Sequence, residues 1–246
     1  MLVFIVPLKS ARKSQSWELV CQLFQRSLQS LCNQDCLAFH VIVVCNEKPT
    51  IHFQHPQVEY VQVDFPDPKE TNPIAWGLTD KGRKVLKGLL AAEKYQPTHT
   101  MVVDADDCVS SRLASYVKQY PQENGWFLQK GYKYIDNSQY LYFKRREFYR
   151  MTGTANILRY DLNDIPESPE WNRGCGYYKF HINHQKIKLM MAEQGTPLKA
   201  LPFPGAVYIL GTGENMSGNE QRLSFSWISR RCITHSLSQE FCLQPQ

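Results

Sequence analysis

Apolar residues gather in four short runs within the first 103 positions, and each run ends at polar residues or at proline. The runs cover residues 2–6, 39–45, 58–63 and 100–103. Runs of this length without strict alternation are typical of strands that are covered on both faces. Helices on both sides of a mostly parallel sheet provide that cover. The pattern therefore predicts an α/β fold around a mostly parallel central sheet.

Two segments between these runs have the spacing of amphipathic helices. Residues 16–32 place their apolar side chains on one face. Residues 80–95 form a second, basic helix in which Val85 and Leu89 face inward, so its lysines and arginine are expected mainly on a solvated face. A third helix is expected over 110–119. The predicted order is strand, helix, strand, strand, helix, strand.

The character of the sequence changes after residue 120. Residues 125–160 are rich in Tyr, Phe, Lys and Arg, which indicates short antiparallel strands. The later part predicts a polar loop, a helix, a strand or turn region and a C-terminal helix, over residues 161–173, 182–194, 198–210 and 223–232. No linker-like composition separates the two parts. We therefore expect a single domain over 1–246, with halves 1–120 and 121–246.

Composition narrows the classes of protein that fit. The 246 residues carry a net charge of +5, which suits anionic small ligands or a membrane surface but is too diffuse to indicate nucleic acid. No stretch approaches the roughly 18 consecutive apolar residues of a membrane-spanning helix. The short apolar N-terminus lacks the basic segment of a signal peptide. Eight cysteines without a Cys-x-x-Cys pair predict free thiols and a cytoplasmic location.

The sharpest chemical signal is Asp104-Ala105-Asp106, which follows the fourth apolar run. On an extended chain, carboxylates at positions i and i+2 point the same way. Converging hard oxygen donors suit Mn²⁺ or Mg²⁺, which bridges diphosphate oxygens and offsets the charge on a leaving group. The alternative is an acidic turn in which Asp107 caps the next helix. Ligands of open α/β sheets bind at the carboxyl ends of the strands, where Lys9 and Asn46 also lie.

Three stretches of the chain together resemble one known family. They are Val3-Phe4-Ile5-Val6-Pro7-Leu8-Lys9, the helix over 16–32, and Met101-Val-Val-Asp-Ala-Asp-Asp107. Over about residues 1–210 the chain resembles glycosyltransferases of the GT-A fold, of the family 2 type. The resemblance implies a GT-A-like fold with a smaller antiparallel region on the acceptor side. It also implies transfer of a sugar from a UDP- or GDP-sugar to a hydroxyl of a carbohydrate or lipid-linked acceptor.

The resemblance assigns roles to individual residues. It implies that 1–120 bind the nucleotide sugar through the loop after the first strand, with contacts from Pro7, Leu8 and Lys9. Asp104 would contact the ribose or the metal ion, and Asp106 would be the firm metal ligand. A looser match, residues 152–156 with Arg159, would place the acceptor within 121–246.

Two positions depart from the family pattern. An acidic residue after the second strand usually reads the base, whereas this chain has Asn46-Glu47, so Asn46 is the candidate contact. The Glu-Asp pair whose aspartate is the base of inverting members is absent, and the corresponding loop offers Asp164, Glu167 and Glu170. We expect Glu170 to accept the proton of the acceptor hydroxyl if the reaction inverts configuration. A retaining reaction needs no such base.

Imidazole and basic groups complete the expected site. In several GT-A enzymes a C-terminal histidine completes the metal site, and His181 is favoured over His184 because it follows the predicted acceptor loop. A surface or core histidine is the alternative. Lys84 is the expected diphosphate contact on the basic helix, against a purely solvated helix face. The run 211–217 is either a phosphate-clasping loop or a glycine-rich turn.

Other functions stay open on the residues alone. A haloacid-dehalogenase-type phosphohydrolase also places Asp-x-Asp after a strand, although its nucleophile normally opens the domain. A sugar nucleotidyltransferase would need glycines in the first loop, which residues 8–12 lack. A non-catalytic carbohydrate-binding relative, with Trp171 or Tyr177 as sugar platforms, is the third. The aromatic and basic residues over 132–143 suit either strand packing or peripheral contact with an anionic membrane.

Overall fold

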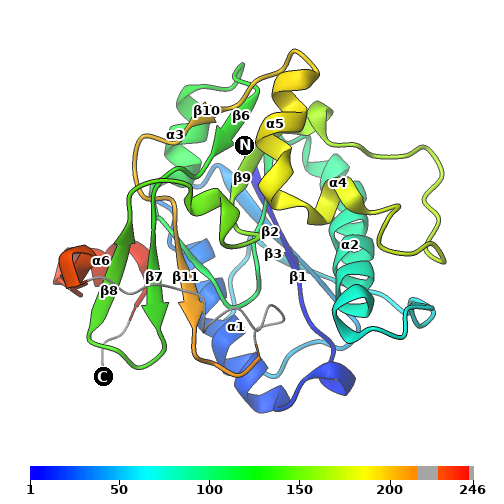
Figure 1. Cartoon of the computed structure of the whole chain (residues 1–246), viewed down its shortest axis with the longest axis horizontal. Helices are drawn as coiled ribbons and strands as arrows, with labels where there is room; N and C mark the ends of the chain where they lie inside the picture. Colours follow the sequence, from blue (N-terminus) through cyan, green and yellow to red (C-terminus); the bar gives the residue numbers. More distant parts are fainter. Residues whose placement is uncertain (215–226, 244–246) are drawn as a thin grey trace.

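The computed structural model describes residues 1–214 and 227–243 (Figure 1). The strands of its larger sheet are β1 (Leu2–Pro7), β2 (Phe39–Cys45), β3 (Val58–Gln62), β4 (His99–Val102), β6 (Gly125–Phe127), β9 (Asn156–Arg159) and β10 (Lys199–Ala200). The strands of its smaller sheet are β5 (Cys108–Val109), β7 (Gly131–Ile135), β8 (Tyr140–Lys144), β11 (Ala206–Leu210) and β12 (Arg230–Cys232). The helices are α1 (Trp17–Cys32), α2 (Pro73–Ala92), α3 (Leu113–Gln119), α4 (Lys179–Ile182), α5 (His184–Glu193) and α6 (His235–Phe241).

The larger sheet has the mostly parallel order that the apolar runs predict. Its strands follow one another as β10-β6-β9-β4-β1-β2-β3. β9 is antiparallel to both of its neighbours, and the other pairs are parallel. The smaller sheet, β12-β8-β7-β11-β5, has one parallel pair and is otherwise antiparallel. The predicted combination of a mostly parallel sheet and a smaller antiparallel region is confirmed.

Alternate residues of β1 face two different layers. Leu2, Phe4 and Val6 pack into the core that also contains apolar residues of α1, α3 and β11. Val3 and Ile5 face the opposite way, into the core beneath α2. Both faces of the strand are thus fully buried, because side chains of a strand alternate between the faces of its sheet. This explains why its apolar run is uninterrupted.

Helix α2 begins seven residues before the predicted start. The Asn72 side chain accepts hydrogen bonds from two backbone N–H groups of the first turn, at 3.0 and 3.2 Å, and Pro73 occupies the first helical position. Both are strong start signals. The helix lies close to β1, since a Cβ at Gly88 would come within 2.4 Å of the Ile5 side chain.

The second half differs from the prediction in two helices. The predicted helix 182–194 is interrupted at Asn183, where α4 ends and α5 begins. The predicted tail helix is wrong over 227–232, where a short 3₁₀ turn (Trp227–Ser229) precedes strand β12, while position 223 lies outside the described residues. All eight cysteines are free thiols. Among the described residues, no helix combines the length and the apolar character needed to cross a bilayer.

Candidate functional site

Three aspartates follow β4 at the carboxyl edge of the larger sheet. Because β1 and β4 are parallel neighbours, the exit of β1 and the segment Asp104–Asp107 lie at the same edge. The amide of Asp107 donates a hydrogen bond to the carbonyl oxygen of Asp104 at 3.0 Å, which closes a tight turn. The structure therefore places the predicted motif where open α/β sheets bind ligands.

Asp104 is held by basic and polar groups from two other segments. Its carboxylate pairs with the Lys81 ammonium and accepts hydrogen bonds from the Gly153 amide at 3.1 Å and the Thr152 hydroxyl at 3.3 Å. Burial alone would raise the pKa of Asp104, but the charge and hydrogen bond of Lys81, the charge of His184 and the Gly153 amide hold that pKa below its ordinary value. Asp104 is thus an anion with a resident positive partner.

Gly153 sits against this ion pair and leaves no room for a side chain. A Cβ at position 153 would come within 2.6 Å of the Lys81 Nζ and 2.8 Å of a carboxylate oxygen of Asp104. The amide of Asp104 in turn donates to the Thr154 hydroxyl at 2.9 Å. The turn 152–154 is therefore fitted closely around the first aspartate.

The other two aspartates have the opposite electrostatic character. Burial, followed by the charge of Asp104, raises the pKa of Asp106 to about 6. Burial and the charges of its two neighbours also raise the pKa of Asp107. Asp107 accepts hydrogen bonds from the Thr152 hydroxyl at 2.5 Å and from the Ile209 amide at 3.1 Å. It therefore joins the motif to β11 and does not cap the next helix.

Lys84 supports the exit of β1 from inside the protein. Its side chain is 1% exposed, and its ammonium donates to the Leu8 carbonyl oxygen and pairs with Asp80, both at 2.8 Å. The neighbouring Arg83 is also buried and donates to the Pro66 carbonyl oxygen. The expectation of a solvated basic face is wrong at these two positions. Direct contact of Lys84 with a diphosphate has no support in this arrangement, whereas Lys81 reaches the motif.

Pro7, Leu8 and Lys9 form the predicted β1 exit, and Leu8 is buried. Lys9 faces the carboxylate of Glu214, a residue to which the sequence analysis assigned no role. Its ammonium pairs with the Glu214 carboxylate at 2.6 Å. The other carboxylate oxygen of Glu214 accepts from the amides of Gln15 and Ser16, at 2.8 and 2.7 Å, at the start of α1. The glycine-rich run from 211 thus folds onto the β1–α1 loop as far as Glu214, and residues 215–217 lie outside the described residues.

Asn46 and Glu47 follow β2 at the same edge. The Asn46 amide donates to the Val63 carbonyl oxygen at 3.4 Å, and its own side-chain oxygen is buried without a hydrogen-bond partner among the described residues. The Glu47 carboxylate accepts a hydrogen bond from the Ala11 amide. Glu47 therefore fixes the loop after β1, while Asn46 keeps an unused acceptor.

The two histidines lie in different surroundings. Burial lowers the pKa of His184, the charge of Lys81 lowers it further, and the charge of Asp104 opposes both, so this ring lies near the motif. Its Nε2 atom is buried without a hydrogen-bond partner among the described residues. Burial lowers the pKa of His181 to about 4, and the charge that opposes this shift is that of Asp164.

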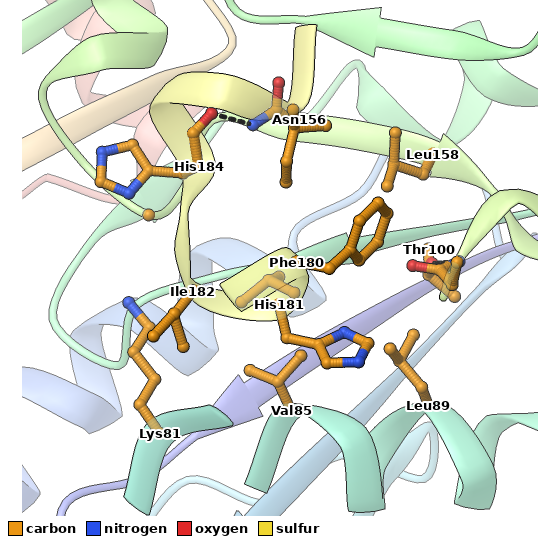
Figure 2. A pocket seen from close by; sticks show the side chains of 14 residues that line it. Lys81, Val85, Leu89, Thr100, Asn156, Leu158, Phe180, His181, Ile182 and His184 are labelled. Atoms are coloured by element: carbon orange, nitrogen blue, oxygen red, sulfur yellow. Dashed lines mark hydrogen bonds between the residues drawn. The ribbon is translucent and has the colours of Figure 1, made fainter. Parts of the chain in front are cut away.

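Figure 2 shows the same separation. The ring of His181 lies above α2 between Val85 and Leu89, while the ring of His184 points away from it. Both residues line a narrow cavity of about 30 Å³, which is room for one or two water molecules. The structure thus brings His184, rather than the predicted His181, towards Asp104. The helix break at Asn183 causes the difference.

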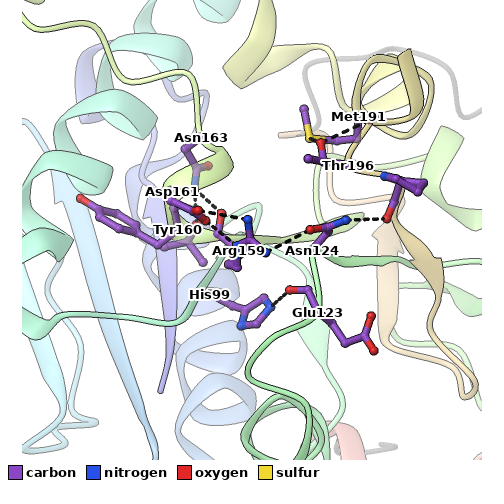
Figure 3. A network of polar contacts seen from close by, with 11 residues as sticks. His99, Glu123, Asn124, Arg159, Tyr160, Asp161, Asn163, Met191 and Thr196 are labelled. Carbon is purple, nitrogen blue, oxygen red and sulfur yellow. Dashed lines mark hydrogen bonds and ion pairs between the residues drawn. The ribbon is translucent and has the colours of Figure 1, made fainter. Parts of the chain in front are cut away.

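Glu170 and Arg159 lie apart from the motif. Glu170 is exposed and pairs with Arg173 at 2.8 Å, and it is not among the groups that shift the pKa of Asp104. Arg159 pairs with Asp161 and lies opposite His99, the first residue of β4 (Figure 3). It therefore lies at the amino-terminal end of β4, whereas the aspartates follow the carboxyl end. The looser match at 152–156 does reach Asp104, because β9 runs antiparallel to β4.

The candidate ligands for a divalent ion are the carboxylates of Asp104, which pairs with Lys81 here, and Asp106. No group of three or more His, Cys, Asp or Glu side chains among them is arranged to hold a metal ion. Asp104 and Asp106 offer the hard oxygens that Mn²⁺ and Mg²⁺ prefer. The crowding that raises the pKa of Asp106 would be relieved by a bound cation. The residues therefore fit an ion that is shared with a ligand's phosphate oxygens.

Comparison with solved structures places the fold. S. aureus TarS (1–349) in complex with UDP-GlcNAc is similar with a TM-score of 0.50 and 14% identity, over 88% of this chain and 60% of that chain. The chain has the fold of a GT-A-type glycosyltransferase. The same protein in complex with UDP gives a TM-score of 0.48 at 14% identity, over 85% and 60% of the two chains. The chain thus spans about 60% of the TarS chains. No family profile matches the sequence, and neither does any curated protein.

Proposed function

We propose that this protein is a glycosyltransferase that uses a nucleotide-diphosphate sugar. The observation that carries the proposal is the cluster Asp104–Asp107 at the carboxyl edge of β4, beside the exit of β1, in a GT-A fold. The similar TarS structure was determined with UDP-GlcNAc, which supports a UDP-sugar as the donor here, and a GDP-sugar is the alternative. The acceptor would be a carbohydrate or lipid-linked hydroxyl.

In this proposal the diphosphate binds along the edge between the β1 exit and the aspartates. Asp104 and Asp106 would hold Mn²⁺ or Mg²⁺, which when bound supplies positive charge to the leaving diphosphate. Lys81 keeps Asp104 ionised and adds a second positive charge at the same place. The Thr152 hydroxyl bonds both Asp104 and Asp107 and so fixes the spacing of the carboxylates. His184 is a better candidate than His181 for a further ligand, since its ring is close enough to Asp104 for their charges to interact and its Nε2 has no hydrogen-bond partner among the described residues.

The acceptor would enter from the side of residues 150–175. Glu170 stays the predicted base for an inverting reaction, although its carboxylate pairs with Arg173 here. Its replacement by glutamine would slow an inverting transfer and leave donor binding unchanged. A retaining reaction would tolerate the change.

The decisive experiment measures nucleotide binding and donor hydrolysis with one pair of matched variants. Wild-type protein is titrated with UDP and with GDP, with and without Mn²⁺, and UDP-GlcNAc hydrolysis is followed. Asp106→Asn should abolish both the metal-dependent binding and the hydrolysis. Asp161→Asn makes the same chemical change at the opposite edge of the sheet and should alter neither.

Each outcome has a definite meaning. Metal-dependent binding without hydrolysis or transfer would favour a non-catalytic carbohydrate-binding relative. Unchanged binding in Asp106→Asn would contradict the proposed site. Failure of wild-type protein to bind any nucleoside diphosphate would contradict the proposed function.

A further inference from the structure

One edge of the smaller sheet carries a concentrated positive charge. Lys144, Arg145 and Arg146 stand at the end of β8 and just beyond it. Strand β12 pairs antiparallel with β8 and adds Arg230 and Arg231. In this register the turn before β12 runs beside the end of β8, and the two elements are in contact. Five cations therefore lie along a single edge, and we name these five residues the basic edge.

The basic edge also presents two large apolar side chains to solvent. Trp227 is 77% exposed and Ile228 is 89% exposed, and both belong to the turn before β12. The guanidinium of Arg230 stacks on Trp227 at 4.1 Å and on Tyr140 at 4.1 Å. Scattered exposed apolar residues are ordinary on protein surfaces. Here two are adjacent, and one of them is held in place by a cation of the basic edge.

The charges of the basic edge are not neutralised within the part of the chain that the structure describes. None of its five side chains forms an ion pair with a carboxylate there, whereas Arg26, Arg112 and Lys94 each pair with an acid elsewhere. A surface depression is lined by three of these cations, Lys144, Arg145 and Arg146, together with Gln129, Lys130 and Phe143. Among the described residues, an anionic partner would therefore find five positive charges without a carboxylate partner, three of them around a hollow.

We propose that the basic edge, with Trp227 and Ile228, binds the surface of an anionic lipid bilayer. Tryptophan favours the boundary between water and hydrocarbon, since its ring is apolar and its N–H group is polar. Lysines and arginines near such a surface are attracted by the negative lipid headgroups. Two apolar tips flanked by cations match this boundary. A stable protein–protein interface buries about 800 Å² on each partner, which is far more than two exposed side chains supply. Nucleic acid would use the charges without an exposed isoleucine.

This inference goes beyond the proposed function, because the basic edge is separate from the aspartate motif. It gives the protein a defined orientation on a membrane, so that a lipid-linked acceptor would be met at the surface and not in solution. Nucleotide binding measured without lipid does not depend on membrane contact through the basic edge. The two proposals can therefore fail separately.

The test is co-sedimentation of the full chain with lipid vesicles. Vesicles of phosphatidylcholine mixed with phosphatidylglycerol should bind the protein, and vesicles of phosphatidylcholine alone should bind it much less. Salt at about 1 M, which shortens the screening length to about 3 Å, should release most of the protein. A blue shift of tryptophan emission on binding should disappear in Trp227→Ser.

Paired variants assign the binding to this edge. Arg145→Gln/Arg146→Gln should weaken binding roughly 25-fold, since each cation near an anionic surface contributes about fivefold. Trp227→Ser/Ile228→Ser should weaken it at all salt concentrations. Lys69→Gln/Lys179→Gln removes the same charge from exposed positions in the loop before α2 and in α4, across the molecule from β8 in Figure 1, and should have little effect.

Two results would overturn the proposal. One is failure of the wild-type chain to bind the anionic vesicles. The other is equal loss of binding in the control pair and in the Arg145/Arg146 pair, which would show that overall charge, and not this edge, is responsible. Far-ultraviolet circular dichroism of each variant verifies that it is folded.

Discussion

Replacing Asp106 with asparagine should make the protein without ligand more stable at alkaline pH. The carboxyl group has a pKa raised from 3.8 to about 6 by burial and by the charge of Asp104. The folded state therefore holds this proton more tightly than the unfolded chain does. Between these two pKa values the folded state binds more protons, so its stability falls as the pH rises. The penalty is complete above pH 6 and absent below pH 3.8.

The size of the effect follows from the shift. About two pKa units at 1.36 kcal/mol each correspond to about 3 kcal/mol. Asp106 keeps some contact with solvent, which screens part of the repulsion, so we expect about 1–3 kcal/mol. In a domain of this size, each kcal/mol raises the melting temperature by about 2–4 °C. Asparagine preserves the shape of the side chain and removes the charge.

Thermal unfolding in chelator-treated buffer measures the difference between Asp106→Asn and wild-type protein at pH 8 and pH 4.5. The variant should melt higher at pH 8, and the two proteins should converge at pH 4.5. Addition of Mn²⁺ with UDP at pH 8 should raise the melting temperature of wild-type protein only. A variant that is less stable at pH 8, or a difference that does not change with pH, would refute the electrostatic reasoning.

Four further changes test other parts of the protein. Lys84→Met should lower the free energy of unfolding by about 3 kcal/mol, because it leaves the Leu8 carbonyl and the partly buried Asp80 carboxylate without their cation. Lys87→Met on the same helix should lower it little, and urea unfolding measures both. His184→Gln should weaken Mn²⁺-dependent UDP binding more than His181→Gln does, as titration calorimetry would show. The folded protein keeps the His181 ring neutral down to about pH 4, whereas the unfolded chain binds a proton near pH 6.5. Wild-type protein should therefore lose stability as the pH falls from 6.5 to about 4, and His181→Gln should reduce that loss. Glu214→Ala should lower the free energy of unfolding by about 2 kcal/mol, because two amides and a lysine lose their acceptor; a change below experimental error would show that this contact is not formed in solution.

The parts of the fold that could be predicted are those where one physical pattern dominates. The run Leu2–Val6 is buried on both faces, so only a strand between two layers of helices accommodates it. The spacing of Asp104 and Asp106 after such a strand places carboxylates at the edge where ligands bind. In both cases neighbouring residues carry the whole signal.

The remaining site depends on contacts between distant residues. Lys84 is a cation on a basic helix by sequence, and its burial arises because Leu8, 76 positions away, turns a carbonyl towards it. The surroundings of His181 and His184 differ because the helix breaks at Asn183, between them. No proline or glycine in the sequence marks this break. Glu214 binds residues about 200 positions earlier. No local periodicity contains such information.

The way Thr152 and Asp107 join separate segments also makes the carboxylates observable one at a time. The amide of Gly153 donates to Asp104 at 3.1 Å, and the amide of Ile209 donates to Asp107 at 3.1 Å. The resonance frequency of an amide proton moves when its carboxylate acceptor gains a proton or shares its charge with a cation. Two backbone signals, from a turn and from a strand, thus report on two neighbouring acids in the native chain. The order in which those acids release their protons becomes readable by nuclear magnetic resonance without altering a single residue.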